Sequence, residues 1–288
     1  MCDETDLDEF AGKSVNGLSR REFAATGALA GLAACTSMDS AGGPSGLTES
    51  MVQIPTADGT MDAFFVHPTN KAPAVILWPD IAGLREVKKA MARRLAGQGY
   101  AVLVANPYYR DAPAPQFADF ADFMKSNGFA KVGPWRAKAT PEASIRDANA
   151  LVAWLDGQRA VDTRRGIGNQ GYCMGGPYTV YTAAAAPARV KAAASFHGGG
   201  LVTDQPTSPH RMLQKGTHYL FAIAQNDDSK QPQAKDMLRQ AADAAGAPAV
   251  IEVYPADHGW TVPDSPVYNH EQAERAWGQM LTLYGGAL

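Results

Sequence analysis

The sequence of 288 residues predicts an α/β protein with one mostly parallel central sheet and helices on both faces. One observation is that short, continuous apolar runs recur, as at 74–78 (Ala-Val-Ile-Leu-Trp), which is typical of strands buried on both faces. Another is that segments with apolar residues at helical spacing lie between these runs. The composition, 45% hydrophobic and 19% charged, suits a large buried core. We therefore expect a single α/β domain over 51–288, built with right-handed crossovers.

The first elements of this domain are predicted from their turn residues and apolar spacing. Strands at 51–54 and 61–66 flank a turn at 57–59 (Ala-Asp-Gly). The helix expected over 86–98 has apolar side chains at a spacing of four and ends before a glycine. A second buried strand, 100–105, is closed by Asn-Pro.

The segment 108–140 interrupts the alternation of strands and helices. It contains several prolines and an unusual number of aromatic residues. These aromatic residues include Phe117, Phe120, Phe123, Phe129 and Trp135. We expect an irregular lid or cap over a site rather than a part of the sheet.

Regular alternation resumes at Pro141, which is expected to open a helix that runs to Leu155. Ile145, Ala148 and Leu151 fall on one face of that helix. The remaining expected strands are 165–172, 190–196, 217–224 and 249–253, and the remaining expected helices are 174–186, 230–245 and 267–284.

The N-terminal segment, 1–35, has the pattern of a twin-arginine-type export signal. Arg20 and Arg21 precede a short, weakly apolar run rich in Ala and Gly. This run ends in Leu-Ala-Ala-Cys, similar to a bacterial lipobox, in which Cys35 would carry a lipid. Residues 36–50 are rich in Ser, Gly and Thr and suit a flexible linker. We expect a periplasmic or membrane-anchored bacterial lipoprotein; the alternative is an amphipathic helix on a cytoplasmic protein.

The overall charge and the cysteines limit the classes of partner. A formal net charge of -3 gives no electrostatic reason to expect nucleic acid, and membrane contact is expected only through a lipid at Cys35. The three cysteines, Cys2, Cys35 and Cys173, lack metal-ligand spacing and cannot form a disulfide framework. We therefore expect no metal site, and a small molecule as the partner.

Cys173 is the candidate nucleophile. The run 171–176 reads Gly-Tyr-Cys-Met-Gly-Gly and lies between an expected strand and an expected helix, which is the setting of a nucleophile elbow. Small residues two positions before and after the nucleophile let the strand and helix approach. The helix dipole favours the thiolate, and the Met174 N–H is positioned as an oxyanion-hole donor. The alternative is that Cys173 is a small buried core residue.

A cysteine nucleophile needs a base, and the base needs an orienting acid. The chain order nucleophile, acid, histidine points to His258, in a loop between the last expected strand and the last helix. The acid should follow the strand at 217–224, where Asp227 and Asp228 compete. We favour Asp227, because its neighbour could cap the helix that follows.

The loop after the strand 74–78 is expected to complete the site. Its Ile81 N–H is the second candidate oxyanion donor, and Asp80 stands beside the nucleophile, where it could hold a proton or tune the thiol. The alternative for Asp80 is a plain turn or cap residue. Side chains that flank these loops are candidates to line the pocket, and they are Trp78, Tyr172, His197 and Trp260. For His197 the alternative is a bond to backbone.

Together these residues resemble the dienelactone hydrolase family of α/β-hydrolases. The resemblance extends over 51–288 and is most specific at 171–176. Supporting stretches are 78–83 (Trp-Pro-Asp-Ile-Ala-Gly), 98–102 (Gln-Gly-Tyr-Ala-Val), 226–227 (Asn-Asp) and 257–259 (Asp-His-Gly). The resemblance implies an α/β-hydrolase fold, a Cys-Asp-His triad, no cofactor, and hydrolysis of enol-lactones of the carboxymethylenebutenolidase type.

The sequence departs from that family at two positions. Its best-known members carry a glutamate, said to hold the resting thiol, where this chain has the shorter Asp80. They also place a substrate-binding arginine four residues past the histidine, where this chain has Val262. Because arginine is the natural partner of a substrate carboxylate, its absence weakens the case for dienelactone itself. Arg85, Arg110 and Arg136 are candidate replacements.

Three functions are therefore compared. We expect a hydrolase that cleaves a small ester or lactone through an acyl-enzyme intermediate on Cys173. The first alternative is a non-catalytic, lipid-anchored binding protein that uses the same pocket, which the aromatic segment 117–135 would suit. The second, a thiol redox protein, is weak because the chain has no Cys-x-x-Cys motif or resolving cysteine.

Overall fold

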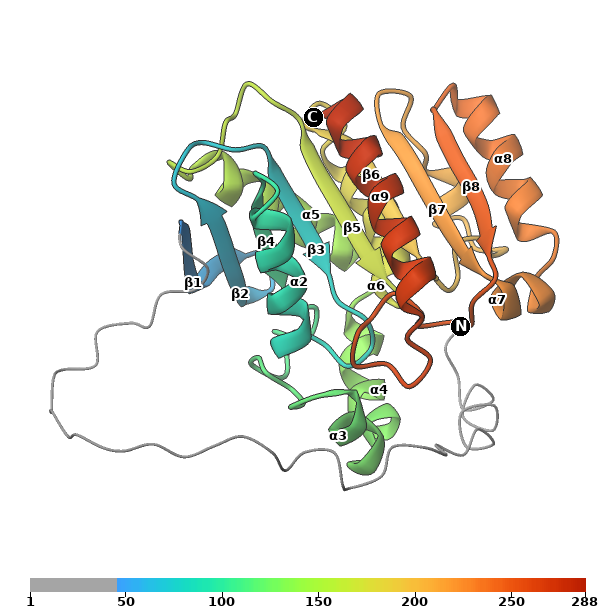
Figure 1. The fold of residues 1–288 in the computed structure, drawn as a ribbon, viewed down its shortest axis with the longest axis horizontal. Helices are drawn as coiled ribbons and strands as arrows, with labels where there is room; N and C mark the ends of the chain where they lie inside the picture. Colours follow the sequence, from blue (N-terminus) through green and yellow to red (C-terminus); the bar gives the residue numbers. More distant parts are fainter. Residues whose placement is uncertain (1–45) are drawn as a thin grey trace, which may run out of the picture.

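The computed structural model describes residues 46–288 and shows an eight-stranded sheet in the order β1-β2-β4-β3-β5-β6-β7-β8 (Figure 1). The strands are β1 (Leu47–Thr56), β2 (Gly59–Pro68), β3 (Ala74–Trp78), β4 (Ala101–Ala105), β5 (Ile167–Tyr172), β6 (Val190–Phe196), β7 (His218–Ala224) and β8 (Ala249–Tyr254). The β1·β2 and β2·β4 pairs are antiparallel, and from β4 to β8 every neighbouring pair is parallel. The predicted α/β class and the mostly parallel sheet are confirmed.

The helices cover both faces of the sheet, as predicted. They are α2 (Glu86–Ala96), α3 (Phe120–Lys125), α4 (Gly128–Lys138), α5 (Pro141–Asp156), α6 (Gly175–Ala185), α7 (Gln225–Lys230), α8 (Ala234–Ala245) and α9 (His270–Ala287). Helices α2 and α9 lie on the near face in Figure 1, and α5 and α6 lie behind the sheet. Successive β3 side chains point to opposite faces, so Val75 and Leu77 pack with α2 and α9 while Ile76 and Trp78 pack with α5 and α6.

Three helix predictions differ from the structure. The helix expected over 230–245 begins only at Ala234, after Pro232, and is α8, while residues 225–230 form a separate helix, α7, that was not predicted. The last helix begins at His270 instead of 267, because the Asn269 side chain accepts the Gln272 N–H at 3.1 Å and caps it. The segment expected to be irregular contains two short helices, α3 and α4.

These two helices form a cap beyond the carboxyl ends of the parallel strands (Figure 1). Helix α3 begins after Asp119, whose side chain accepts the Asp122 N–H at 2.7 Å. Phe123, which is fully buried, contacts the rings of Phe117 and Phe129 at centroid distances of 5.0 and 4.8 Å. The aromatic residues that predicted a cap therefore hold the two helices together.

The described chain begins just before β1. Residues 47–50, which the sequence placed in the linker, belong to that strand and pair with β2. The expected export signal over 1–35, with its arginine pair and Cys35, and the rest of the expected linker up to 45 lie outside the described residues. Among the described helices, none combines the length and apolar character that crossing a membrane requires.

The parallel strands place the candidate site at one edge of the sheet. Strands β3, β5, β7 and β8 run in the same direction, so the loops at their carboxyl ends meet there. These loops carry the residues that sequence analysis selected on four separate segments of the chain.

Candidate active site

Cys173 lies on a strained turn between β5 and α6. Its backbone φ is +52°, a left-handed conformation that is unfavourable for a residue with a side chain. A Cβ on Gly175 would lie 2.6 Å from the Trp78 carbonyl oxygen, and a Cβ on Gly176 would lie 2.5 Å from the Gly198 Cα. A Cβ on Gly171 would overlap the Gly175 carbonyl. The glycines are thus required by close approach, and the turn has the geometry of a nucleophile elbow.

His258 and Asp227 form a hydrogen-bonded pair. The Nδ1 atom of His258 lies 2.7 Å from Oδ2 of Asp227, and the His258 backbone N–H donates to Oδ1 of Asn226 at 2.8 Å. Asp228 points elsewhere and pairs with Nζ of Lys235 at 2.7 Å. Of the two competing carboxylates, the geometry therefore brings Asp227 to the histidine, and Asp228 makes an ion pair instead of capping a helix.

One cavity brings the nucleophile and the base together. It is lined by Asp80, Ile81, Phe120, Phe129, Cys173, His197, His258, Gly259, Val262 and Ser265. The cap contributes Phe120 and Phe129, and the loop after β8 contributes the residues from His258 onward. A substrate carbonyl in this cavity would lie between Cys173 and His258.

Ile81 and Met174 flank the elbow with their backbone. Among the hydrogen bonds found between described residues outside the regular helices and strands, none uses the N–H of either residue. The hydroxyl of Tyr108 donates to the Ile81 carbonyl at 2.8 Å and also lies 3.3 Å from Sδ of Met174. This buried tyrosine therefore joins the loop after β3 to the residue that follows Cys173.

Asp80 is buried and fully engaged by cations from its own loop and from α2. Oδ1 of Asp80 accepts from Arg85 Nη1 at 2.7 Å, and Oδ2 accepts from Arg85 Nη2 at 3.1 Å and lies 2.8 Å from Lys88 Nζ. The Ala82 N–H also donates to Oδ1 at 3.0 Å. Burial raises the pKa of Asp80, but the two cations outweigh it and hold that pKa well below its ordinary value. The carboxylate is thus ionised and committed to this cluster.

The same cluster joins the cap to the loop after His258. Arg85 donates from Nε and Nη2 to the two carboxylate oxygens of Asp264, each at 2.8 Å. The backbone N–H of Phe120, at the start of α3, donates to Oδ2 of Asp264 at 3.0 Å. The loop after β3, the cap and the loop after β8 all line the cavity, and all three are fixed to this one ionic cluster. The sequence did not predict the cluster.

Neither Arg85 nor Arg110 faces the cavity as a substrate clamp. Arg85 is wholly buried in the ionic cluster, and Arg110 binds Asp58 at 2.6 Å and Asp147 at 2.8 Å. Arg136 belongs to α4 and its charge acts on the buried Tyr108, but it is not among the residues that line the cavity.

Of the four expected pocket residues, only His197 lines this cavity. Trp78 donates to Oγ1 of Thr182 at 3.0 Å inside the core. Tyr172 stacks on Phe196, with ring centroids 5.1 Å apart, and Trp260 is fully buried. These three aromatic side chains support the site from behind, because they fill the core beneath the loops.

His197 is buried against both Cys173 and His258. Its Nδ1 accepts the Cys173 backbone N–H at 3.2 Å, and its Nε2 lies 2.8 Å from Oγ1 of Thr261. The rings of His197 and His258 are 4.9 Å apart in an edge-on arrangement. Burial, with a further contribution from His258, holds the pKa of His197 well below its ordinary value. Of its two expected roles, lining the pocket or bonding to backbone, the structure shows both.

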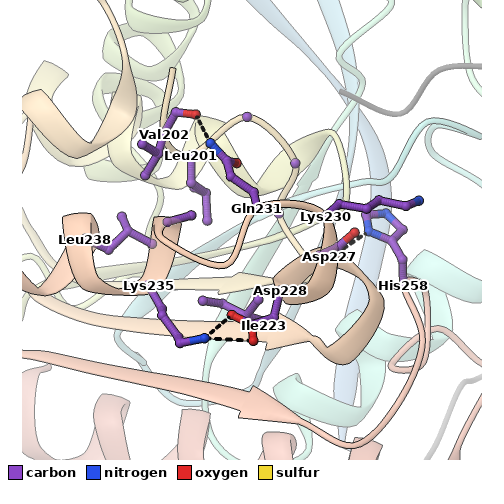
Figure 2. A pocket seen from close by; sticks show the side chains of 14 residues that line it. Leu201, Val202, Ile223, Asp227, Asp228, Lys230, Gln231, Lys235, Leu238 and His258 are labelled. Carbon is purple, nitrogen blue, oxygen red and sulfur yellow. Dashed lines mark hydrogen bonds and ion pairs between the residues drawn. The ribbon is translucent and has the colours of Figure 1, made fainter. Parts of the chain in front are cut away.

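A second cavity lies beside the Asp227–His258 pair (Figure 2). Its floor is the glycine run 198–200, and its walls come from α7 and α8. Figure 2 shows Gln231 donating to the Val202 carbonyl, at 3.1 Å, and the Lys235–Asp228 ion pair at the other side. His258 lines both cavities, so the base lies at their common border.

Comparison with the sequences of known proteins identifies one family. A sequence model described as "Dienelactone hydrolase family" matches residues 61–288. A Methylorubrum extorquens protein named "Putative carboxymethylenebutenolidase" is 29% identical over 291 residues, covering 96% of this chain and 95% of that protein. An Escherichia coli K12 protein of the same name is 28% identical over 251 residues, covering 83% and 89%.

A solved structure agrees with these relatives. The structure titled "Putative Dienelactone Hydrolase" from Klebsiella pneumoniae has a TM-score of 0.68 and 25% identity, covering 83% of this chain and 98% of that one. The elbow, the paired histidine and the sheet order described above are thus found in a chain that matches this family over most of its length. On these grounds the protein belongs to the dienelactone hydrolase family and is a carboxylic ester hydrolase.

Proposed function

We propose that the protein hydrolyses a small ester or lactone with Cys173 as nucleophile, His258 as base and Asp227 as the orienting acid. The observation that carries this proposal is the 2.7 Å pair between His258 and Asp227, with His258 and the strained Cys173 lining one cavity. Because Nδ1 of His258 is bound to Asp227, we assign Nε2 as the atom that accepts the thiol proton.

In the first half of the reaction the thiol becomes acylated. His258 takes the proton from Sγ of Cys173, and the sulfur bonds to the substrate carbonyl carbon. The carbonyl electron pair moves to oxygen, where the N–H groups of Ile81 and Met174 stabilise it. When the tetrahedral intermediate collapses, the C–O bond breaks and the leaving oxygen takes the proton from His258. A thioester and an alcohol result; in a lactone the two stay joined.

In the second half, water releases the acid. His258 takes a proton from water, the water oxygen bonds to the thioester carbon, and the C–S bond breaks. The sulfur recovers the proton, so the net reaction consumes one ester and one water and yields an acid and an alcohol. None of these steps uses Asp80, because both of its carboxylate oxygens are bound to Arg85 and Lys88.

Turnover of a short-chain 4-nitrophenyl ester by Cys173→Ala and Cys173→Ser tests the proposal. We expect Cys173→Ala to lose all activity above background, and the intact mass of the wild type to show an acyl adduct on Cys173 with a slowly hydrolysed lactone. Undiminished turnover by Cys173→Ala would refute the nucleophile assignment. Folding of both variants is checked by circular dichroism.

The export signal over 1–35 and a lipid on Cys35 stay a separate proposal. They are supported by the Arg20-Arg21 pair and the Leu-Ala-Ala-Cys sequence alone. The N-terminal mass of the protein from its native host decides between a lipidated cysteine, a cleaved signal and an intact cytoplasmic chain.

A further inference from the structure

The walls of the cavity at Cys173 are mostly apolar. Ile81, Phe120, Phe129 and Val262 form its hydrophobic walls. Of the described residues that line it, none is a lysine or an arginine. The substrate group that enters this space therefore meets hydrocarbon and aromatic side chains, which favour apolar contacts.

The buried cations closest to the cavity are already neutralised. Arg85, Lys88, Asp80 and Asp264 carry two positive and two negative charges, so their sum is zero. All three nitrogens of the Arg85 guanidinium donate to these two carboxylates, at 2.7 to 3.1 Å. A substrate anion could recruit Arg85 only by leaving a buried carboxylate without its partner, which is strongly unfavourable.

The reacting groups add no positive charge. Cys173, His258 and Asp227 together carry one net negative charge, whether the proton is on sulfur or on the imidazole. His197 is neutral, because burial holds its pKa well below the ordinary value and its Nδ1 accepts a backbone N–H. Asp80, the remaining titratable group in the lining, is ionised, and its charge is balanced within the cluster of Arg85, Lys88 and Asp264. The lining of this cavity therefore offers an anion no uncompensated positive charge.

We infer that the cavity accepts an uncharged, apolar group, so that the substrates are neutral esters or lactones and not esters that carry a carboxylate. This inference rests on the proposed function and adds the substrate class. Val262 is one of the apolar side chains that line the cavity, so it offers a substrate carboxylate no charged partner. Burial of that carboxylate without a partner costs free energy that apolar contacts with Phe120 and Phe129 cannot return.

A matched pair of esters tests the inference in the unmodified protein. 4-Nitrophenyl hexanoate and mono-4-nitrophenyl adipate have the same acyl chain, except that a methyl group is replaced by a carboxylate. Near neutral pH we expect kcat/KM for the adipate to be lower on the order of 100-fold, after correction for the uncatalysed rate. Equal kcat/KM values, or a higher value for the adipate, would overturn the inference and leave the proposed hydrolase function unaffected.

Substitution of Val262 tests whether this part of the wall excludes a substrate carboxylate. We expect Val262→Arg to raise the adipate-to-hexanoate ratio of kcat/KM by about 10-fold or more, because the guanidinium would pair the carboxylate. Val262→Met is the control, since it adds length without charge and should leave the ratio near that of the wild type. An unchanged ratio in a folded Val262→Arg protein would count against the inference.

Alkylation of Cys173 gives a measurement that needs neither turnover nor a variant. Iodoacetamide is neutral and iodoacetate is anionic, and in both reactions the sulfur forms a C–S bond while the C–I bond breaks and iodide leaves. We expect Cys173 to favour iodoacetamide at least about 10-fold more than N-acetylcysteine does, as measured on the peptide that contains Cys173. The same preference as the free thiol would refute the inference. This result stands even if no ester is hydrolysed, so it separates failure of the inference from failure of the proposed function.

Discussion

The backbone N–H of Cys173 donates to Nδ1 of His197 at 3.2 Å, across 24 positions of sequence. Because Nδ1 accepts, the ring proton lies on Nε2, which donates to Oγ1 of Thr261 at 2.8 Å. His197 itself has a φ of +40°, so its backbone is strained like that of Cys173. The elbow and the loop that follows the proposed base are thus joined through one neutral histidine.

Replacement of His197 should distinguish this positioning role from simple packing. We expect His197→Leu to lower the free energy of unfolding by about 1–3 kcal/mol, because the buried Thr261 hydroxyl loses its partner and the Cys173 N–H keeps only the Phe196 carbonyl. We expect kcat to fall with KM little changed. His197→Asn should retain much of the stability and much of kcat, since its side-chain oxygen can accept the same N–H and Asn tolerates a positive φ. Denaturant unfolding and ester kinetics measure the two effects; equal losses in Leu and Asn variants would contradict a hydrogen-bonding role.

The lowered pKa of His197 predicts a pH dependence of stability. Below a pH of about 6.5 the unfolded chain binds a proton at His197 that the folded protein does not, so stability falls as pH decreases. The slope contributed by this residue is up to about 1.4 kcal/mol per pH unit. Unfolding curves between pH 7 and 5 should therefore be steeper in pH for the wild type than for His197→Asn. The same slope in both proteins would show that His197 is not the group responsible.

Asp227 and Asp228 form a matched pair for testing the proposed acid. We expect Asp227→Asn to lower kcat by about 10³- to 10⁴-fold, because an amide would no longer stabilise the imidazolium or its tautomer. Asp228→Asn loses only a partly exposed ion pair with Lys235, which is worth less than about 1 kcal/mol, so its activity should stay within a few-fold. Steady-state kinetics of both variants test this, and the reverse order of losses would reassign the acid.

Asp80 is predicted to matter for stability, since it is the only carboxylate that the structure shows bound to Lys88 within the described residues. Asp80→Asn should destabilise the fold by about 3–5 kcal/mol, because Arg85 and Lys88 would be left buried without full compensation. The pKa of Asp80 is lowered on folding, so its contribution is present above a pH of about 3.9 and is lost as pH falls below it. Denaturant unfolding at several pH values should show a steeper acid-dependent loss of stability in the wild type than in Asp80→Asn.

Gly176 should not tolerate a side chain. An added Cβ would lie 2.5 Å from the Gly198 Cα and 2.6 Å from Oγ of Ser195, so the elbow would have to move. We expect Gly176→Ala to cost about 1–3 kcal/mol and to lower kcat/KM about 10- to 100-fold. Gly278→Ala on α9 is the control, because nothing lies within 4 Å of its Cβ position. That variant should be as active as the wild type and up to about 1 kcal/mol more stable.

Much of the fold was predictable because most of its strands and helices depend on residues that are close together in the sequence. Continuous apolar runs and residues at helical spacing identified the sheet and the helices on its two faces. The cap was harder, because α3 and α4 are short and depend on contacts among Phe117, Phe123 and Phe129 more than on their own periodicity.

The candidate site was likewise predictable only where its residues depend on near neighbours in the sequence. By itself, the sequence determined the α/β class, the small residues around Cys173, and the loops that carry Asp227 and His258, because each depends on neighbours a few positions away. Only the tertiary structure decided that Asp227 and not Asp228 meets His258, and that Asp80 is held by Arg85. Arg85 is 179 positions from Asp264 and Phe120 is 144 positions from it, so these partners are chosen by sheet order and loop packing. No local pattern can encode a partner at that separation, and for that reason the ionic cluster and the apolar cavity emerged only from the folded chain.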